Sequence, residues 1–219
     1  MQRSSKQIRS GRFITFEGPE GAGKTTQIQR LRAHLEARGF RCVVTREPGG
    51  TPLAETLRAI VKNHSGSETL HDLAELLLIE AARVQHVREV IRPSLDAGAV
   101  VLCDRFCDST TAYQGGARGI DPETIRRLNS LAADGCMPDL TLLLDLPPEA
   151  GFTRTGKRRE TFGKHDRFEE ESRDFHRHVR EAFLAAAAAE PARFRVIDAA
   201  RDADAVFQSI REAADGVVR

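Results

Sequence analysis

The sequence predicts an α/β fold in which five parallel strands form one sheet flanked by helices, and three observations lead to this prediction. First, segments with helical spacing of apolar residues alternate with strand-like segments, which favours a parallel sheet with right-handed crossovers. Second, a glycine-rich loop joins the first strand to the helix after it. Third, the strand-like segments are nearly continuous apolar runs, typical of strands buried on both faces. The five segments are Phe13–Glu17, Arg41–Thr45, Val100–Asp104, Leu140–Leu146 and Phe194–Asp198.

The glycine-rich loop after the first strand is the most specific signal. It runs Gly18-Pro19-Glu20-Gly21-Ala22-Gly23-Lys24-Thr25. This octapeptide fits the pattern of a phosphate-binding P-loop, and Ile28, Leu31 and Leu35 follow it at helical spacing. In such a loop, backbone N–H groups and the positive end of the helix dipole converge on phosphate oxygens. Lys24 is expected to reach the β- and γ-phosphates and Thr25 to reach Mg²⁺. The sequence therefore predicts a P-loop NTPase fold that binds a nucleoside triphosphate.

The second strand leads into the segment REPGG, residues 46–50. A Pro-Gly-Gly turn is a common connector. In a parallel sheet, however, residues that follow the strands gather at the carboxyl edge, where ligands bind. We therefore expect Arg46 to project into a cleft, with Arg58 on the next helix, because the guanidinium fork suits phosphate. A tight turn here also allows a cis peptide bond before Pro48.

Arg83 lies on the following leucine-rich helical segment, directly after the small residues Ala81 and Ala82. Many arginines on helices are simply solvated. Small neighbours also allow a ligand to approach the helix closely, so both interpretations of Arg83 stay open at this point.

The third apolar run ends at Asp104, and Arg105 follows at once. A P-loop enzyme places a carboxylate near Mg²⁺ at the tip of a strand, although an Asp–Arg pair that closes a strand gives the same pattern. The candidate metal ligands are Thr25, Asp104 and Glu17. The polar stretch DSTTAYQGG at 108–116 carries hydroxyl and amide groups, which either read the edge of a base or belong to a polar loop or helix cap.

A basic cluster follows the fourth strand. It contains Arg154, Lys157, Arg158, Arg159, Lys164 and Arg167. Charge runs are usually solvated faces. A mobile, arginine-rich lid that closes over a transferring phosphoryl group gives the same pattern, and the P-loop itself supplies one lysine and no arginine. We expect a lid to span about residues 153–168.

The fifth strand and a C-terminal helix, with Val206, Ile210 and Val217 on one face, complete the alternation. Residues 1–12 are polar and basic and are expected to form a disordered tail, so that 13–219 form a single domain. The net charge of +1 gives no electrostatic case for nucleic acid or membrane binding. No apolar stretch approaches the roughly 20 residues that span a bilayer, and no secretory signal is expected.

The four cysteines form no Cys-x-x-Cys pair, and no histidine cluster accompanies them as a zinc site would require. Two of them, Cys42 and Cys103, fall within expected strands, where cysteine usually acts as a small buried hydrophobe. A reduced cytoplasmic setting is therefore expected.

Together these residues resemble the thymidylate kinase family, whose members phosphorylate dTMP to dTDP with ATP in dTTP biosynthesis. Order and spacing agree over nearly the whole chain after residue 12, and the motifs at 46–50 and 113–116 are far more specific than a P-loop. The matching segments are 16–26, 46–51, 81–83, 104–106 and 112–116. The resemblance implies a homodimer that uses ATP, dTMP and Mg²⁺.

The resemblance also implies roles for individual residues on the donor side. The ATP phosphates would be held by Gly18, Pro19, Glu20, Gly21, Ala22, Gly23, Lys24, Thr25 and Thr26. Glu20 would also lie near the sugar and the acceptor phosphate, and Arg158 in the lid would stabilise the transition state. The lid is a few residues longer than the family pattern, so Arg154 and Arg159 stay alternatives to Arg158.

On the acceptor side, the resemblance implies that Arg58 and Arg105 hold the dTMP phosphate, with Arg46 close by. Arg83 would contact the carbonyl edge of thymine. The rest of that edge would be read by Thr110 and Gln114, while the deoxyribose would pack against Tyr113. We thus expect Lys24, Arg158, Glu20 and Arg105 to carry the catalysis.

One position departs from the family pattern. Where the family usually has a phenylalanine that stacks on thymine, one helical turn before Arg83, this chain has Ile79. An aliphatic side chain still gives apolar contact but lacks the aromatic geometry, worth about 0.5–1.5 kcal/mol. A kinase for another nucleoside monophosphate is therefore the nearest alternative. A P-loop switch or ATPase that acts on a protein or nucleic acid, and a non-catalytic nucleotide-binding module, are alternatives from other classes.

Overall fold

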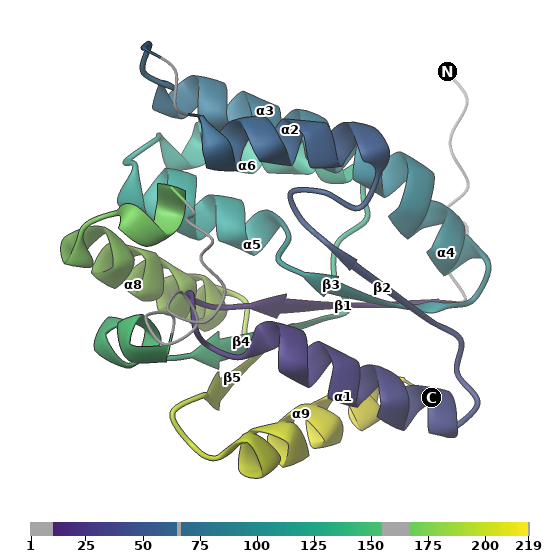
Figure 1. Ribbon diagram of the computed structural model, residues 1–219. Coiled ribbons are helices and arrows are strands. Elements are labelled where there is room, and N and C mark those ends of the chain that lie inside the picture. Colours follow the sequence, from purple (N-terminus) through teal and green to yellow (C-terminus); the bar gives the residue numbers. More distant parts are fainter. Residues whose placement is uncertain (1–10, 65–66, 155–166, 219) are drawn as a thin grey trace.

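The computed structural model of the chain describes residues 11–64, 67–154 and 167–218. Its centre is one five-stranded sheet, parallel throughout, with strand order β2-β3-β1-β4-β5 (Figure 1). The strands are β1 Arg12–Glu17, β2 Cys42–Arg46, β3 Val100–Asp104, β4 Leu140–Asp145 and β5 Phe194–Asp198. The predicted α/β fold with a parallel sheet is confirmed. β3 and β5 have the expected bounds, β1 and β4 differ by one residue at one end, and β2 is shifted by one residue at both ends, where an apolar pattern defines boundaries least well.

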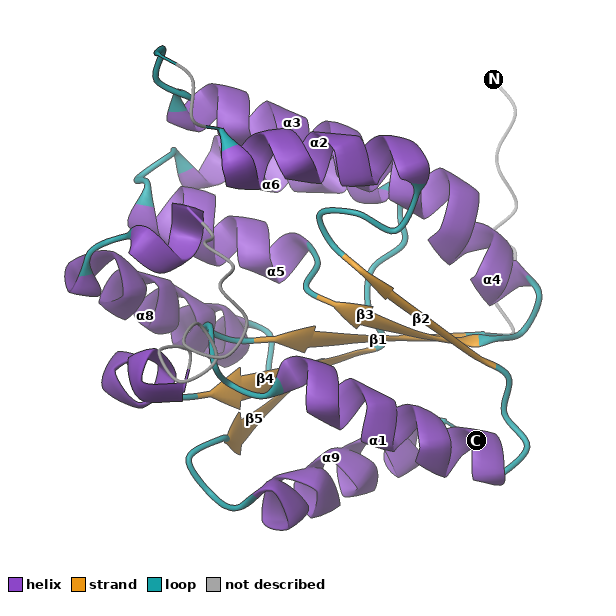
Figure 2. Cartoon of the chain, in the orientation of Figure 1, coloured by secondary structure: helices purple, strands orange, loops and turns teal. Residues whose placement is uncertain are grey.

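Helices connect the strands on both sides of the sheet (Figure 2). The α-helices with assigned bounds are α1 Lys24–Ala37, α2 Pro52–Asn63, α3 Asp72–His86, α4 Arg92–Asp96, α5 Cys107–Thr110, α6 Pro122–Ala133, α8 Arg173–Ala189 and α9 Ala203–Val217. Residues 148–154 are also helical. Three shorter elements complete the set: the π-helical turns η1 Val87–Ile91 and η2 Thr111–Ala117, and the 3₁₀ turn η3 Arg167–Glu170.

The two faces of the sheet bury different side chains because successive residues of a strand point to opposite sides. Ile14, Phe16 and Leu102 belong to the core beneath α1 and α9. Phe13 and Val101 belong to a second core on the other face, under η1 and α4. The predicted C-terminal helix is α9, whose buried stripe ends on Ala214.

The connections bring the ends of three strands to one place. β1 lies between β3 and β4, and its carboxyl end is where the chain continues into α1. In β2, Arg46 is the register partner of Asp104 in β3, and Asp104 is also the register partner of Phe16 in β1. Polar residues at the ends of β2 and β3 therefore lie beside the P-loop, in the position where ligands bind in open α/β sheets.

Side chains fix the starts of four helices. A side-chain oxygen of Thr51, Asp121, Ser172 or Asp202 accepts a hydrogen bond from a backbone N–H in the first turn of α2, α6, α8 or α9, respectively. The turn before α2 contains a cis peptide bond between Glu47 and Pro48.

Three other sequence-based expectations concern the ends and setting of the chain. β1 begins at Arg12, one residue inside the expected tail, and residues 1–10 lie outside the described part. Within the described residues, none of the helices combines the length and apolar character that a membrane crossing requires. The four cysteines are free thiols, and Cys42 is the only one that is not buried.

Replacing Val101 with Ala should destabilise the protein by about 2–3 kcal/mol, because it removes two buried methyl groups and leaves a cavity in the sheet core. Val101 is fully buried in β3. Val196→Ala is the matched control, since Val196 is 51% exposed in β5 and its loss should cost within about 0.5 kcal/mol. Urea unfolding measures both variants, and equal losses would contradict the assignment of the core.

Candidate active site

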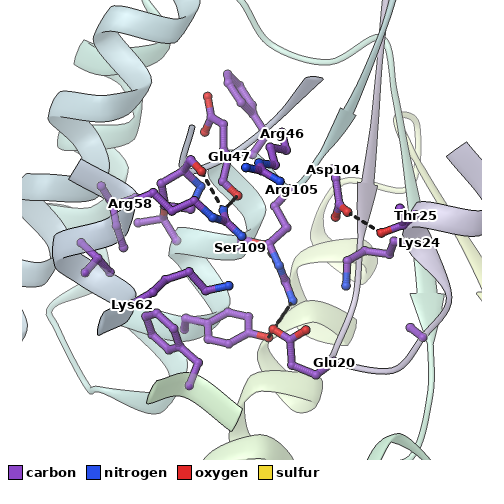
Figure 3. Close-up of a pocket in the computed structure, with 18 of the residues that line it drawn as sticks. Glu20, Lys24, Thr25, Arg46, Glu47, Arg58, Lys62, Asp104, Arg105 and Ser109 are labelled. Carbon is purple, nitrogen blue, oxygen red and sulfur yellow. Dashed lines mark hydrogen bonds and ion pairs between the residues drawn. The ribbon is translucent and has the colours of Figure 1, made fainter. Parts of the chain in front are cut away.

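A cavity of about 370 Å³ opens at the carboxyl ends of β1, β2 and β3 (Figure 3). The side chains around it come from the P-loop, from the turn after β2, from α2 and α3, and from the segment after β3. All eight residues expected to bind the acceptor line this cavity: Arg46, Arg58, Ile79, Arg83, Arg105, Thr110, Tyr113 and Gln114. The P-loop residues from Glu20 to Thr26 line it as well.

The P-loop adopts its shape because glycine occupies the positions that other residues tolerate poorly. Gly18 has φ +129°, and a Cβ atom there would lie 2.3 Å from the Leu144 carbonyl oxygen. Gly23 has φ +87° and directly precedes the first turn of α1. Gly18 and Pro19 do not line the cavity, but their carbonyl oxygens each accept a 3.0 Å hydrogen bond from Nζ of Lys24.

Lys24 is buried at the base of the loop. Burial lowers the pKa of its ammonium group, and the nearby Arg105 guanidinium lowers this pKa further. Glu20 and Asp104 act in the opposite direction. An anionic phosphate in the loop would add a stronger acceptor for Nζ than the two neutral carbonyls it contacts now.

Thr25 and Asp104 together form a site that fits a magnesium ion. The Thr25 hydroxyl donates to Oδ2 of Asp104 over 3.3 Å, whereas Oδ1 of Asp104 is buried without a hydrogen bond among the described residues. An unsatisfied buried carboxylate oxygen beside a hydroxyl suits Mg²⁺, which typically binds one or two carboxylates together with substrate phosphates. Among the described residues, no three His, Cys, Asp or Glu side chains gather as a metal cluster of their own.

The structure gives no support to the expectation that Glu17 binds the metal, because its side chain is bonded elsewhere and does not line the cavity. Its Oε1 accepts from the Phe106 backbone N–H over 2.7 Å, and its Oε2 accepts from the Ser109 hydroxyl over 2.6 Å. Glu17 is absent from the cavity lining. Burial, with a contribution from Asp108, raises its pKa to about 8. Glu17 therefore positions the segment after β3.

Arg105 joins the two halves of the cavity. Its Nη1 donates to the Gly18 carbonyl oxygen over 3.1 Å, and its Nη2 donates to Oε1 of Glu20 over 2.7 Å and to the Tyr113 hydroxyl over 3.1 Å. Its backbone has φ +70°, which is uncommon outside glycine and often accompanies functional sites. One guanidinium thus contacts both the P-loop and the expected acceptor site.

Glu20 is held in its ionised form by this arrangement. Burial opposes ionisation, but the positive charges of Arg105, Lys24 and Lys62 lower its pKa to about 2. Figure 3 shows Glu20 and Lys24 on the P-loop side, facing Arg58 and Lys62 across the cavity.

The other two phosphate-binding candidates differ in how they are held. Arg58 points into the cavity from α2, and its Nη1 donates to the Pro48 carbonyl oxygen over 2.7 Å. Arg46 is half exposed and forms an ion pair with Glu55 over 2.8 Å. Arg46 therefore has an acidic partner at the rim of the cavity, and the carbonyl groups of Glu47 and Pro48 help to orient Arg58.

Arg83 is buried and its guanidinium is almost fully hydrogen-bonded. Nε donates to Glu47, Nη1 donates to Glu80 and Asn129, and Nη2 donates to Thr110, all over 2.7–2.8 Å. These bonds use four of the five N–H groups of an arginine. One N–H on Nη2 is left, on a residue that lines the cavity, so it can donate to a ligand carbonyl.

The base-reading candidates lie beside an apolar wall. Ile79 and Phe168 line the same cavity, and the Phe168 ring lies edge-on to Tyr113 at 5.7 Å between centroids. Nε2 of the buried Gln114 donates to Glu75 over 2.7 Å. Phe168 thus supplies an aromatic side chain to a cavity in which Ile79 replaces the expected one.

Sequence reasoning missed several residues that line or brace the cavity. Glu47 belongs to the 46–50 motif but was given no role, and it bonds both Arg83 and His86. Lys62 lies four residues after Arg58 on α2, a spacing that places both on one helix face. Phe168 is the last residue of the expected lid but was given no role, because its place in the cavity depends on contacts with residues distant in the sequence.

Of the three lid arginines considered for catalysis, the structure describes Arg154 alone. Arg158 and Arg159 lie outside the described residues. Arg154 is described, lines the cavity, and donates through Nη1 to the Gly21 and Ala199 carbonyl oxygens over 3.3 and 3.0 Å.

Comparison with known proteins agrees with this geometry. The family model for thymidylate kinase matches residues 16–210. A thymidylate kinase from Solidesulfovibrio magneticus is 53% identical over 90% of this chain and 96% of the relative, and one from Geobacter sulfurreducens is 55% identical over 86% and 89%. The crystal structure of thymidylate kinase from Ehrlichia chaffeensis has a TM-score of 0.75 at 37% identity, covering 94% of this chain and 98% of that one.

Replacing Glu20 with Gln should make the stability of the protein less dependent on acid pH. The folded-state pKa of about 2 lies below the ordinary value of 4.5, so ionised Glu20 stabilises the fold fully above pH 4.5. That contribution is lost as the pH falls from 4.5 toward 2. Urea unfolding at a series of pH values should therefore show the difference between the wild type and E20Q shrinking in acid.

The exposed Glu89 provides a control, since E89Q also removes one carboxylate. A difference between the wild type and E20Q that stays constant with pH would contradict the ionised Glu20–Arg105 pair.

Proposed function

The chain belongs to the thymidylate kinase family and is a nucleoside monophosphate kinase that phosphorylates dTMP, and on this premise we propose which residues bind each substrate and which stabilise charge. The acceptor phosphate oxygen of dTMP attacks the γ-phosphorus of ATP in line, and the products are dTDP and ADP. The acceptor phosphate is already ionised near neutral pH, so no strong general base is needed. Catalysis then consists mainly of positioning and of charge stabilisation.

On the donor side, residues 18–26 hold the ATP phosphates with their backbone N–H groups, and Lys24 contributes a positive charge. The position of Lys24 Nζ, at hydrogen-bond distance from two loop carbonyls, supports this role. Thr25 and Asp104 would hold Mg²⁺, and the unpartnered Oδ1 of Asp104 supports that assignment. When bound, the metal neutralises negative charge on the triphosphate.

On the acceptor side, Arg58 and Arg105 hold the dTMP phosphate, with Arg46 at the rim. The remaining N–H of Arg83 donates to a thymine carbonyl, with Thr110 beside it. Gln114 accepts from the N3–H group of the base. Tyr113 packs against the deoxyribose, and Ile79 and Phe168 flank the base with apolar surface.

The single observation that carries this proposal is the set of contacts around Arg105. The same guanidinium bonds the carbonyl oxygen of Gly18 in the donor loop and faces the acceptor cavity through Glu20 and Tyr113. An arginine shared by both sites brings the two substrates within reach of one another and offsets charge repulsion between them. Glu20, kept ionised by its cationic neighbours, fixes this arginine. Arg158 is proposed as the transition-state arginine that the lid adds.

We further propose a cytoplasmic setting and no nucleic acid or membrane partner. The four free thiols and the net charge of +1 support this view.

Replacing Lys24 with Ala should lower the rate of transfer by at least a factor of about 10², because it removes the only lysine of the P-loop from the triphosphate. The measurement is ADP release with ATP and Mg²⁺, with dTMP, dUMP, dCMP or CMP as acceptor. The melting temperature shows whether K24A stays folded. Chelation of Mg²⁺ should also abolish the wild-type rate.

Substantial turnover by folded K24A would contradict the role of Lys24. If dTMP failed to raise ADP release above that with water alone, the proposed reaction would be wrong. Faster turnover of dUMP or CMP than of dTMP would overturn the assignment of the base site alone.

A homodimer is also proposed, through the outer face of α2, α3 and α6. Six of the eight exposed large hydrophobic residues in the described chain lie on these three helices. Figure 1 shows the three helices together at one side of the molecule. The six residues are Leu53, Ile60, Leu73, Leu77, Val84 and Leu131. Exposed apolar side chains gathered on neighbouring helices are typical of a protein–protein interface.

Replacing Leu77 with Glu should therefore convert a dimer into a monomer, because it places a charge within the apolar face. Sedimentation velocity at micromolar concentration measures the change. Val196→Glu alters an equally exposed residue on β5, outside this face, and should stay dimeric. A monomeric wild type, or a dimeric L77E, would refute the proposed interface.

A further inference from the structure

Glu75 on α3 binds a different group at each of its two carboxylate oxygens, although its side chain is fully buried. Its Oε1 accepts from Nε2 of Gln114 over 2.7 Å. Its Oε2 accepts from two arginines, Arg167 on η3 and Arg118 at the end of η2, the latter over 3.5 Å. The carboxylate therefore lies between a pair of cations and the amide that faces the acceptor cavity.

An ionised carboxylate can only accept hydrogen bonds, so it dictates which end of the Gln114 amide faces it. The NH₂ end must turn toward Glu75, and the carbonyl end must turn away. Among the described residues, none donates a hydrogen bond to Oε1 of Gln114. This oxygen is also not one of the buried polar atoms that lack a hydrogen-bond partner. Since Gln114 lines the cavity, its acceptor end can face a ligand there.

We propose that Glu75 is a positioning residue that sets base specificity by holding the Gln114 carbonyl toward the acceptor base. This inference rests on the proposed function, because it takes the acceptor to be a pyrimidine monophosphate. Thymine carries an N–H donor at N3, which a carbonyl oxygen accepts. Cytosine carries an acceptor at N3, which the same oxygen repels. Discrimination between the two rings thus depends on a carboxylate placed behind the residue that touches the base.

The two arginines determine how a neutral glutamine at position 75 would be oriented, and this orientation would reverse that of the Gln114 amide. Arg167 and Arg118 both donate to the position of Oε2 and so favour an acceptor there, and Arg118 is held in addition by Glu171 and Asp72. A glutamine at position 75 would place its carbonyl oxygen there and its NH₂ group toward Gln114. Gln114 would then turn its own carbonyl inward and present N–H to the base. The variant keeps the shape of the cluster and inverts the hydrogen-bond polarity at the cavity.

The test compares Glu75→Gln with the wild type, using dTMP and dCMP as acceptors at saturating ATP. We expect the ratio of kcat/KM for dTMP to that for dCMP to fall at least about tenfold, a typical size for a polar contact that becomes mismatched. The loss for dTMP should lie mainly in KM, and the KM for ATP should stay unchanged. A role limited to stability would lower both acceptors alike and leave their ratio intact.

Asp72→Asn is the matched control. Asp72 is on the same helix and also pairs with Arg118, over 3.4 Å, but among the described residues no hydrogen bond joins it to Gln114, and its side chain is 51% exposed. Glu75→Asp is a second variant, which keeps a group that can only accept. It should retain the dTMP preference even if overall activity falls. Because it also keeps the negative charge, it still tests the proposal if E75Q does not fold.

The outcomes separate this inference from the proposed function. If the wild type does not phosphorylate dTMP, the proposed function fails first. If it does, and folded E75Q keeps the wild-type ratio, the role of Glu75 is refuted. A loss of the dTMP preference in E75D as well as in E75Q would also refute this role, because the charge and acceptor character of residue 75 would then not be the cause of the preference.

Discussion

The buried guanidinium of Arg83 is the interaction on which the organisation of the acceptor half depends. A charge in the protein interior is tolerated only when it is paired and hydrogen-bonded. Arg83 meets this requirement with Glu47 after β2, Glu80 on its own helix, Thr110 on α5 and Asn129 on α6. Four segments far apart in the sequence are thereby held around one cation. The cost of leaving any of these charges unpaired fixes their relative positions.

Arg105 plays the corresponding role between the two halves of the site. It is placed by the end of β3, where Glu17 anchors the following turn through Phe106 and Ser109. Its contacts with the P-loop and with Glu20 make the two proposed substrate sites share a wall. The pKa of Glu20 is low because the surrounding positive charges outweigh its burial, whereas the pKa of Lys24 is lowered first by burial and then by the charge of Arg105.

Much of this arrangement could be predicted from local patterns, and the exceptions have a common cause. The P-loop, the strands and the acceptor residues were recognisable because each belongs to a contiguous motif. Glu17 was expected at the metal, since strand-end carboxylates commonly lie there, yet its two oxygens are bonded to the segment after β3. Arg46 was placed in the cleft correctly, but its partner Glu55 was not foreseen. Glu75 and Phe168 drew no attention, because their importance arises from neighbours distant in the sequence.

The sequence by itself determined the class of fold, the position of the P-loop and most of the residues that line the cavity. These depend on periodicity and on short motifs, which express the geometry of single elements and their turns. The tertiary structure alone decided which polar atoms are satisfied by the protein and which remain open to a ligand. Oδ1 of Asp104, one N–H of Arg83 and Oε1 of Gln114 are distinguished only when every neighbouring donor and acceptor is in place. Hydrogen-bond satisfaction is a property of the packed assembly, and no local pattern encodes it.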